Sequence, residues 1–306
     1  MTRNQRGFIF IALAVAGYSC LPVFTGILLD FGLAALDIAL WRYVLATPLL
    51  WLLAWTMEAR GAGDASASRL PRIRLALMGA MLAVAALAAF VGLDLIPAGT
   101  YVVIFYTYPA MVALIMLILG ERLSGWGWFA VLLTLVGVGL TAPDFSAGLS
   151  GDNFTGVLLA IFNAAVVSIY FILSGKLLRG KTALITASAL TCTGALVSLL
   201  AVALFSGIQL PPSPAAWLAM LGLAVISTSL PVFSINKGIQ LLGASRAAVV
   251  GSFEPLLTAL LAMIFLNQAM QTIQWLGGIV IVISVILLQT LGARQTTSVV
   301  PNPAGD

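Results

Sequence analysis

The sequence of 306 residues has no histidine, only two cysteines, and charged residues at just 8% of its positions. About a quarter of the residues in a soluble domain are charged, so this composition excludes an ordinary soluble domain. The missing histidine removes the commonest metal ligand and proton relay. Cys20 and Cys192 lie in separate apolar segments, which predicts neither a disulfide framework nor a metal site. We therefore expect no metal and no cofactor. The net charge of +4 is spread thinly and indicates no nucleic-acid partner.

The sequence is instead rich in long apolar segments, since 61% of its residues are hydrophobic. Several segments exceed the roughly 18 residues that indicate a membrane-spanning helix. The first is too long for a signal peptide and lacks a cleavage site, so we interpret it as a span. We predict an all-α polytopic membrane protein, with the lipid bilayer as its partner. The ten predicted transmembrane helices are 7–29, 35–57, 73–93, 98–119, 125–142, 153–174, 182–206, 214–236, 245–266 and 272–292.

The charged residues divide between the two sides of this ten-helix arrangement. The Lys and Arg residues of the loops all fall on the side of the termini. The opposite loops hold Asp30, Asp94, Asp144 and Asp152 instead. Because basic loops stay in the cytoplasm, both termini are predicted to be cytoplasmic. Arg42 is the exception, since it lies inside the second span.

An internal repeat appears when the sequence is shifted by 146 residues against itself. Gly92 then matches Gly238, and Pro109 matches Pro255, without a gap. The chain is predicted to consist of a first five-helix repeat, 1–146, and a second one, 147–306, with a short polar tail from about 293. Five is an odd number, so the repeats are predicted to insert with inverted topology around a central cavity.

The stretch "YPAMVALIMLILGERLSGWGWFAVLLTLVGVGLT" at 108–141 resembles the signature of EamA-type transporters of the drug/metabolite transporter superfamily. The segments "LWRYVLATPLL" at 40–50 and "FEPLLTALLAMIFLNQAM" at 253–270 resemble two further family elements. Where the second repeat of the family carries Gly-Glu, Leu266 and Asn267 stand here. Among its branches, the chain is similar to the bacterial aromatic amino-acid exporters of the YddG type. The resemblance implies a multi-pass protein of the bacterial inner membrane that exports or exchanges small metabolites.

Polar and aromatic residues at helical spacing within the spans predict a cavity lining. The predicted substrate-binding residues are Tyr18, Tyr101, Phe105, Tyr108, Asn163, Tyr170, Ser227, Glu254 and Thr258. The predicted gating or structural residues are Arg42, Pro22, Pro109, Pro231 and Pro255. Packing between helices is the alternative explanation for such residues. Tyr101 fits an interfacial aromatic belt as well as the cavity, whereas for Asn163 and Tyr170 we favour the cavity. Spans five and ten carry almost no deep polar residue, so we expect them to line no part of the cavity. Their small residues permit close packing with each other or with a second protomer in a homo-oligomer.

Two charged residues lie deep in the predicted spans. Glu254 is about eight residues, or roughly 12 Å, into span nine, where an ionised group is costly and by default functional. It would face the cavity, and Pro255 would bend its helix. A carboxyl that clamps two helices is the alternative interpretation. For Arg42 we favour a structural role, with its side chain reaching either toward Glu254 or outward to Asp37 or Asp94, over binding of a substrate carboxylate.

The predicted function is a secondary transporter of small metabolites that works by alternating access, with amino acids, aromatic ones included, as the first substrate candidates. The alternatives are a nucleotide-sugar or drug-type carrier and, in another class, an intramembrane enzyme. An enzyme would need a convergent set of catalytic groups, which Glu254 and Arg42 alone do not form. No nucleotide-binding loop is recognisable in the sequence, so no ATP-binding subunit is implied.

Cysteine labelling tests the predicted orientation. Single cysteines at Asp144 and Ser150 are expected to react with an impermeant reagent from outside the cell. Single cysteines at Ser66 and Thr182 are expected to react from inside. Labelling of position 66 from outside would show that the ten-span arrangement is wrong.

Overall fold

The computed structural model describes residues 3–57, 70–120, 124–141, 151–177, 183–242, 250–251, 253–268 and 270–291. Ser66, Asp144, Ser150 and Thr182, and the tail from about 293, lie outside these residues. The regular secondary structure of the described ranges is helical throughout, as the composition predicts. The termini's orientation and the division at residue 146 stay predictions.

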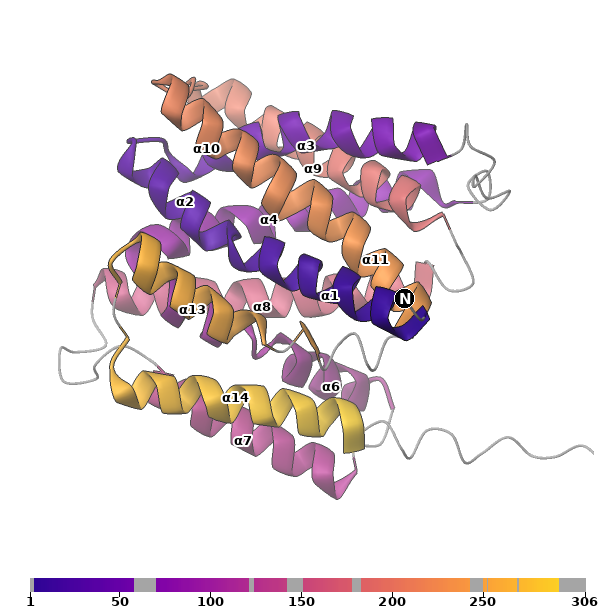
Figure 1. The fold of residues 1–306 in the computed structure, drawn as a ribbon, viewed down its shortest axis with the longest axis vertical. Helices are drawn as coiled ribbons and strands as arrows, with labels where there is room; N and C mark the ends of the chain where they lie inside the picture. The colour runs from indigo at the N-terminus through magenta and orange to yellow at the C-terminus, as the bar shows by residue number, and fades with distance from the viewer. Residues whose placement is uncertain are drawn as a thin grey trace, which may run out of the picture.

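The helices follow the predicted spans in order along the chain (Figure 1). The first half contains α1 (Arg3–Ser19), α2 (Leu21–Asp30), α3 (Ala35–Met57), α4 (Arg72–Leu95), α5 (Ala98–Phe105), α6 (Tyr108–Ile118) and α7 (Gly125–Thr141). The second half contains α8 (Asp152–Leu177), α9 (Leu184–Ser206), α10 (Pro214–Ala224), the π-helix η4 (Val225–Ser229), α11 (Leu230–Leu242), α13 (Glu254–Phe265) and α14 (Thr272–Leu291).

These helices have the length and surface of a membrane protein. Seven segments of the described chain are long and apolar enough to cross a bilayer, and three shorter apolar helices occupy the remaining predicted spans. Large apolar side chains are exposed on their outer faces, including Phe205, which is 93% exposed. Soluble monomers do not present so much contiguous apolar surface to water. The protein is therefore a multi-pass membrane protein whose outer face contacts lipid.

Helix contacts repeat between the two halves. Span one packs on span eight through α1 and α11, and span six packs on span three through α8 and α4. The 146-residue shift exchanges one with six and three with eight, so each pair is the counterpart of the other. Spans five and ten, α7 and α14, pack directly on each other and lie side by side in Figure 1. This pattern fits the inverted repeat that the sequence predicts.

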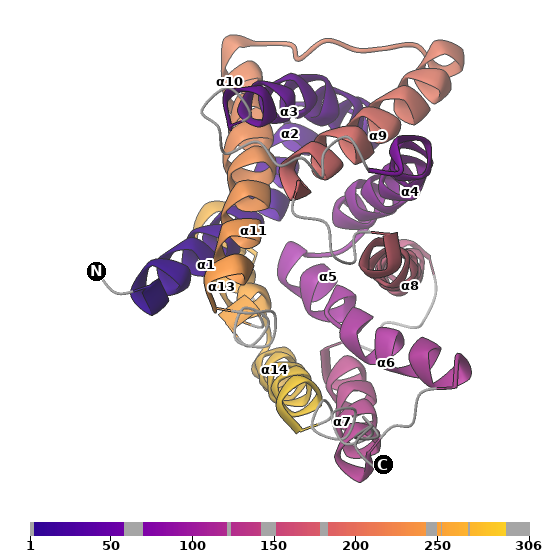
Figure 2. The same ribbon diagram turned by 90° about the vertical axis from the view of Figure 1, so that its right-hand side faces the viewer.

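Glycines allow neighbouring helices to approach closely at two crossings, that of α4 with α9 and that of α7 with α14. A Cβ atom at Gly194 of α9 would lie 1.8 Å from the carbonyl oxygen of Ala76 in α4. A Cβ atom at Gly137 of α7 would lie 2.5 Å from Cγ1 of Ile281 in α14. Helices in lipid associate largely by van der Waals packing, which such close approach maximises. The view in Figure 2 shows α4 and α9 adjacent at one end and α7 and α14 adjacent at the other.

Three spans are interrupted, and each interruption has a proline in the first turn of the helix that follows. Span one breaks at Cys20 ahead of Pro22, and span four breaks after Phe105 ahead of Pro109. In span nine, α13 begins at Glu254, so Pro255 occupies a first turn and does not bend a continuous helix as the sequence predicted. The first turn suits proline because its missing N–H would have no partner inside the helix.

The glycine contacts generate a paired stability prediction. Gly194→Ala should destabilise the protein by about 1–3 kcal/mol, because the α4 backbone leaves no room for a methyl group. Gly139→Ala on α7 should be neutral or stabilise by up to about 1 kcal/mol, since nothing lies near its added methyl and alanine favours a helix. Thermal unfolding in detergent measures both. Equal melting temperatures for the two variants would contradict the close α4–α9 crossing.

Candidate functional site

A cavity of about 600 Å³ lies between the helices of the two halves. Its lining is mostly apolar and aromatic and comes from spans one, two, three, four, six, eight, nine and ten. Eight of the residues singled out in the sequence line it: Tyr18, Pro22, Arg42, Tyr101, Phe105, Tyr108, Asn163 and Glu254. The binding roles of these residues stay predictions, but the fold brings them to one place.

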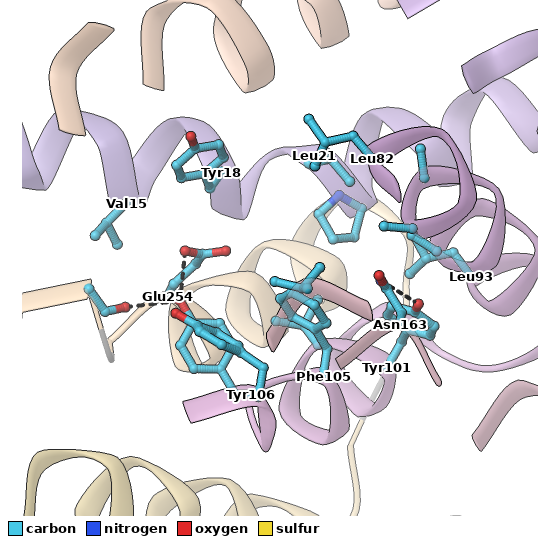
Figure 3. A pocket seen from close by; sticks show the side chains of 18 of the residues that line it. Val15, Tyr18, Leu21, Leu82, Leu93, Tyr101, Phe105, Tyr106, Asn163 and Glu254 are labelled. Carbon is cyan, nitrogen blue, oxygen red and sulfur yellow. Dashed lines mark hydrogen bonds between the residues drawn. The ribbon is translucent and has the colours of Figure 1, made fainter. Parts of the chain in front are cut away.

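The broken ends of three spans meet at Glu254. Tyr106, at the break in span four, donates a hydrogen bond from its hydroxyl to Glu254 Oε2 at 2.7 Å (Figure 3). The same hydroxyl lies 3.2 Å from the carbonyl oxygen of Gly251. Ser19, at the break in span one, donates to the carbonyl oxygen of Glu254 at 3.3 Å. Breaks in helices expose backbone groups that lipid cannot satisfy, and here side chains from other spans provide part of the missing hydrogen bonding.

Arg42 is held by span eight. Its Nε donates to Thr228 Oγ1 at 2.8 Å, and Thr228 Oγ1 itself lies 2.9 Å from the carbonyl oxygen of Leu223. Thr228 belongs to the π-helix η4, whose wider turn leaves that carbonyl available. The guanidinium carbon lies 5.5 Å from the ring centroid of Tyr43 and 5.8 Å from that of Phe90. The side chain is thus fixed between two rings and a hydroxyl, with its end at the cavity.

The expected reach of Arg42 toward Asp37 is not what the structure shows. Asp37 Oδ1 accepts a hydrogen bond from the backbone N–H of Gln209 at 3.0 Å and thereby fixes the loop before α10. Asp94 is exposed. Within the described residues, no carboxylate forms an ion pair with Arg42. Arg42 thus lines the cavity without a carboxylate partner among the described residues.

Glu254 and Arg42 thus line one cavity. No salt bridge joins the two groups in the described part of the chain. A cavity with a carboxyl group, a guanidinium and a mostly apolar and aromatic wall can accept a small molecule that carries both a cation and an anion.

Stacked aromatic rings form one wall of the cavity. The rings of Tyr108 and Phe171 stack at a centroid distance of 5.4 Å and an angle of 13°. Phe105 lies 5.4 Å from Tyr108 at 35°, which extends the wall along span four. Tyr106 packs against Tyr108 edge to face at 5.6 Å. A flat aromatic ligand would find both ring faces and ring edges here.

Some of the predicted substrate residues lie outside the lining. Tyr170 is turned toward α9, where its hydroxyl interacts with Thr191, and the cavity face of α8 is formed by Asn163, Val167 and Phe171 at a spacing of four. Ser227 and Thr258 are fully buried between helices. Tyr170 follows Asn163 by seven residues, a spacing that keeps close to one face of a helix, but the lining of α8 advances by four residues at a time and reaches Phe171 instead.

Three of the predicted prolines also lie outside the lining. Pro109 and Pro255 are buried in the first turns of α6 and α13, where each is the second residue of its helix. Pro231 packs against α1, because a Cβ at Gly17 would lie 2.5 Å from its Cγ. The lining residue of α11 is Ile235, which lies one helical turn beyond Pro231.

Sequence reasoning missed Tyr43, Tyr106 and Phe171, which all line the cavity. A continuous helix would turn Tyr106 well over 90° away from the face of Tyr101 and Phe105. The lining of α5 is broader than that face, however, because Val102 also lines the cavity. Tyr106 follows Val102 by four residues and stays on its side of the helix, since the N–H of Tyr106 still bonds to the carbonyl oxygen of Val102 at 3.0 Å. The pair of tyrosines around a Pro-containing break is the signal that could have found it.

The expectation that span ten lines no part of the cavity is wrong. Val285 of α14 belongs to the lining. The helix α14 packs behind α5, α6 and α13, and at the breaks of spans four and nine no continuous helix stands between α14 and the cavity. For span five the expectation agrees with the structure, since the lining includes no described residue of α7.

Comparisons with known proteins agree with this architecture. The model of the EamA-like transporter family matches residues 5–142 and again residues 154–290. The chain belongs to the EamA-like transporter family. The two matches place one family domain on each side of the middle of the chain, as expected for a duplicated transporter. The protein is therefore a membrane transporter of the drug/metabolite transporter type.

Relatives share this description. The uncharacterized transporter YcbK of Bacillus subtilis (strain 168) is 26% identical over 89% of this chain and 88% of its own length. The uncharacterized transporter sll1319 of Synechocystis is 27% identical over 65% of this chain and 61% of its own length. One solved crystal structure has a TM-score of 0.66 at 18% identity and covers 95% of this chain and 99% of its own. At that identity the likeness concerns the fold alone.

Paired tyrosine variants test the junction at Glu254. Tyr106→Phe removes the donor to the carboxyl group and should destabilise the protein by about 1–3 kcal/mol. Tyr108→Phe, two residues away, also keeps its ring contacts but removes a hydroxyl that makes no hydrogen bond within the described residues, so it should change the melting temperature far less. The melting temperatures of both variants, measured in the same detergent, compare the two effects. Equal effects would show that the Tyr106 hydrogen bond contributes nothing to the junction.

Proposed function

We propose that this transporter exports or exchanges amino acids, aromatic ones included, across the bacterial inner membrane by alternating access. The observation that carries the proposal is the presence of Arg42 and Glu254 in one cavity whose remaining wall is mostly apolar and aromatic. An amino acid is a zwitterion with a side chain of variable size. Arg42 suits its carboxylate, Glu254 suits its ammonium group, and the rings of Phe105, Tyr108 and Phe171 suit an aromatic side chain.

The size of the cavity supports a metabolite of this kind. Its volume of about 600 Å³ falls within the range of small-molecule sites, roughly 300–1,000 Å³. A nucleotide sugar carries two phosphates, and Arg42 is the one cation in the described lining, so its charge matches that substrate poorly. A lipophilic cation of the drug type is a closer competitor, because Glu254 and the aromatic wall could hold it without Arg42.

The interrupted spans are the parts of the fold suited to movement. In transporters built of inverted repeats, discontinuous helices near the midplane surround the site and change their packing as access alternates. Here the breaks in spans one, four and nine converge on Glu254. Pro22, Pro109 and Pro255 fix the start of each second segment, so a change of direction is concentrated at the residue before them. We infer that transport is facilitated or exchange-driven, with both termini cytoplasmic.

Competition with labelled tryptophan in reconstituted liposomes tests the proposal. Tryptamine lacks the carboxylate and indole-3-propionate lacks the ammonium group. Each should compete at least about tenfold more weakly than tryptophan, because each leaves one charged side chain without its partner. Saturable counterflow of tryptophan would identify a carrier.

Variants then assign each charge to one end of the substrate. Arg42→Gln should remove the disadvantage of tryptamine, and Glu254→Gln should remove that of indole-3-propionate. Arg72→Gln and Asp30→Asn, which change exposed residues at helix ends, serve as matched controls. A transporter that binds tryptamine but neither tryptophan nor indole-3-propionate, and that is indifferent to Arg42→Gln, would be a cation carrier and the proposal would be wrong.

A further inference from the structure

A second polar pair lies in the cavity, away from Glu254. Asn163 Nδ2 donates a hydrogen bond to the hydroxyl oxygen of Tyr101 at 2.9 Å. Both residues line the cavity, although only 5% of Asn163 and 3% of Tyr101 is exposed. Asn163 Oδ1 is buried and has no hydrogen-bond partner. A buried carbonyl oxygen without a partner costs free energy, so its retention in a cavity lining points to a partner that arrives with the ligand.

The pair is held rigidly. The ring of Tyr101 fills the space beside Gly92 of α4, where a Cβ atom would lie 2.3 Å from Tyr101 Cε2. This close fit fixes the position of the hydroxyl, and the bond from Nδ2 to that hydroxyl fixes the rotation of the Asn163 amide. The free oxygen is therefore presented in one orientation, as a site that discriminates between ligands requires.

The Asn163–Tyr101 pair lies where the far end of a molecule bound at Glu254 would reach. Figure 3 shows the Asn163–Tyr101 pair and the Glu254–Tyr106 pair apart from each other, with Phe105 between them. An aromatic amino acid whose ammonium group lies at Glu254 would extend past Phe105 toward Asn163. The far edge of its ring would then approach Asn163 Oδ1.

We propose that Asn163 is a specificity-determining residue, whose Oδ1 accepts a hydrogen bond from an N–H or O–H group on the distal edge of an aromatic substrate. The inference rests on the proposed function for the orientation of that substrate. It selects a class within the aromatic amino acids: those with a polar hydrogen on the ring, such as an indole N–H or a phenol O–H, over those with a plain phenyl ring.

Isosteric ligands without the polar hydrogen test this assignment. Benzothienylalanine replaces the indole N–H of tryptophan by sulfur and keeps the shape of the ring system. Equilibrium binding to the purified full-length protein should favour tryptophan over benzothienylalanine at least about fivefold, since the sulfur leaves Asn163 Oδ1 without a donor. Asn163→Leu should bring this ratio close to one, and Tyr101→Phe, which releases the amide, should lower it. Asn153→Leu, an exposed asparagine in the first turn of the same helix, should leave the ratio unchanged.

A second ligand pair separates this inference from the proposed function. Indole and benzofuran carry the same ring contrast without any amino-acid group. If tryptophan does not bind but indole is favoured over benzofuran in the wild type and not in Asn163→Leu, the amino-acid assignment fails and the role of Asn163 stands. If tryptophan and benzothienylalanine bind equally, the role of Asn163 is overturned and the amino-acid assignment stands. If none of the four ligands binds, or if Asn163→Leu and Tyr101→Phe both retain the preference, the inference is overturned.

Discussion

The hydrogen bond from Tyr106 to Glu254 joins the two interrupted spans on which the site depends. A break in a transmembrane helix leaves backbone carbonyls and N–H groups without partners, and lipid supplies none. The fold places the breaks together in the protein interior, where side chains of neighbouring spans can reach them. The cavity lies at the breaks, and the side chains around it provide hydrogen bonds to the backbone that the breaks leave without partners. Without those side chains, polar backbone groups would face an apolar environment.

The scaffold around the breaks is built differently. Pairs such as α4 with α9 and α7 with α14 approach so closely that glycine is the residue that fits at the crossing. Side chains of α7 and α14 also meet through the hydroxyls of Thr134 and Ser284. These helices gain from dispersion contacts over long stretches. The molecule thus combines tightly packed outer pairs with interrupted inner helices, which confines conformational freedom to the helices that surround the cavity.

The sequence predicted the fold well because lipid imposes strong rules on it. Long apolar segments must be helices, and a 146-residue shift that aligns Pro109 with Pro255 can be read without coordinates. The lining was harder to predict, because helical periodicity holds only within one uninterrupted helix. Tyr106 lines the cavity on the side of Val102 and not on that of Tyr101, and α11 reaches the lining at Ile235 and not at Pro231, which packs against α1. Asn163 and Glu254, which lie on or at the start of regular helices, reached the cavity as polarity and depth predicted.

The 146-residue correspondence pairs Tyr108 with Glu254, so equivalent positions of the two halves carry different chemistry. Both are the first residue of the helix after a break, and both line the cavity. An inverted repeat exchanges its halves as access passes from one side of the membrane to the other. A solute entering from the cytoplasm and one entering from outside therefore meet a phenol and a carboxyl in opposite order. The alternating access proposed above would then make transport kinetically asymmetric: half-saturation would differ between the two sides, although the equilibrium distribution of an uncoupled solute would stay the same.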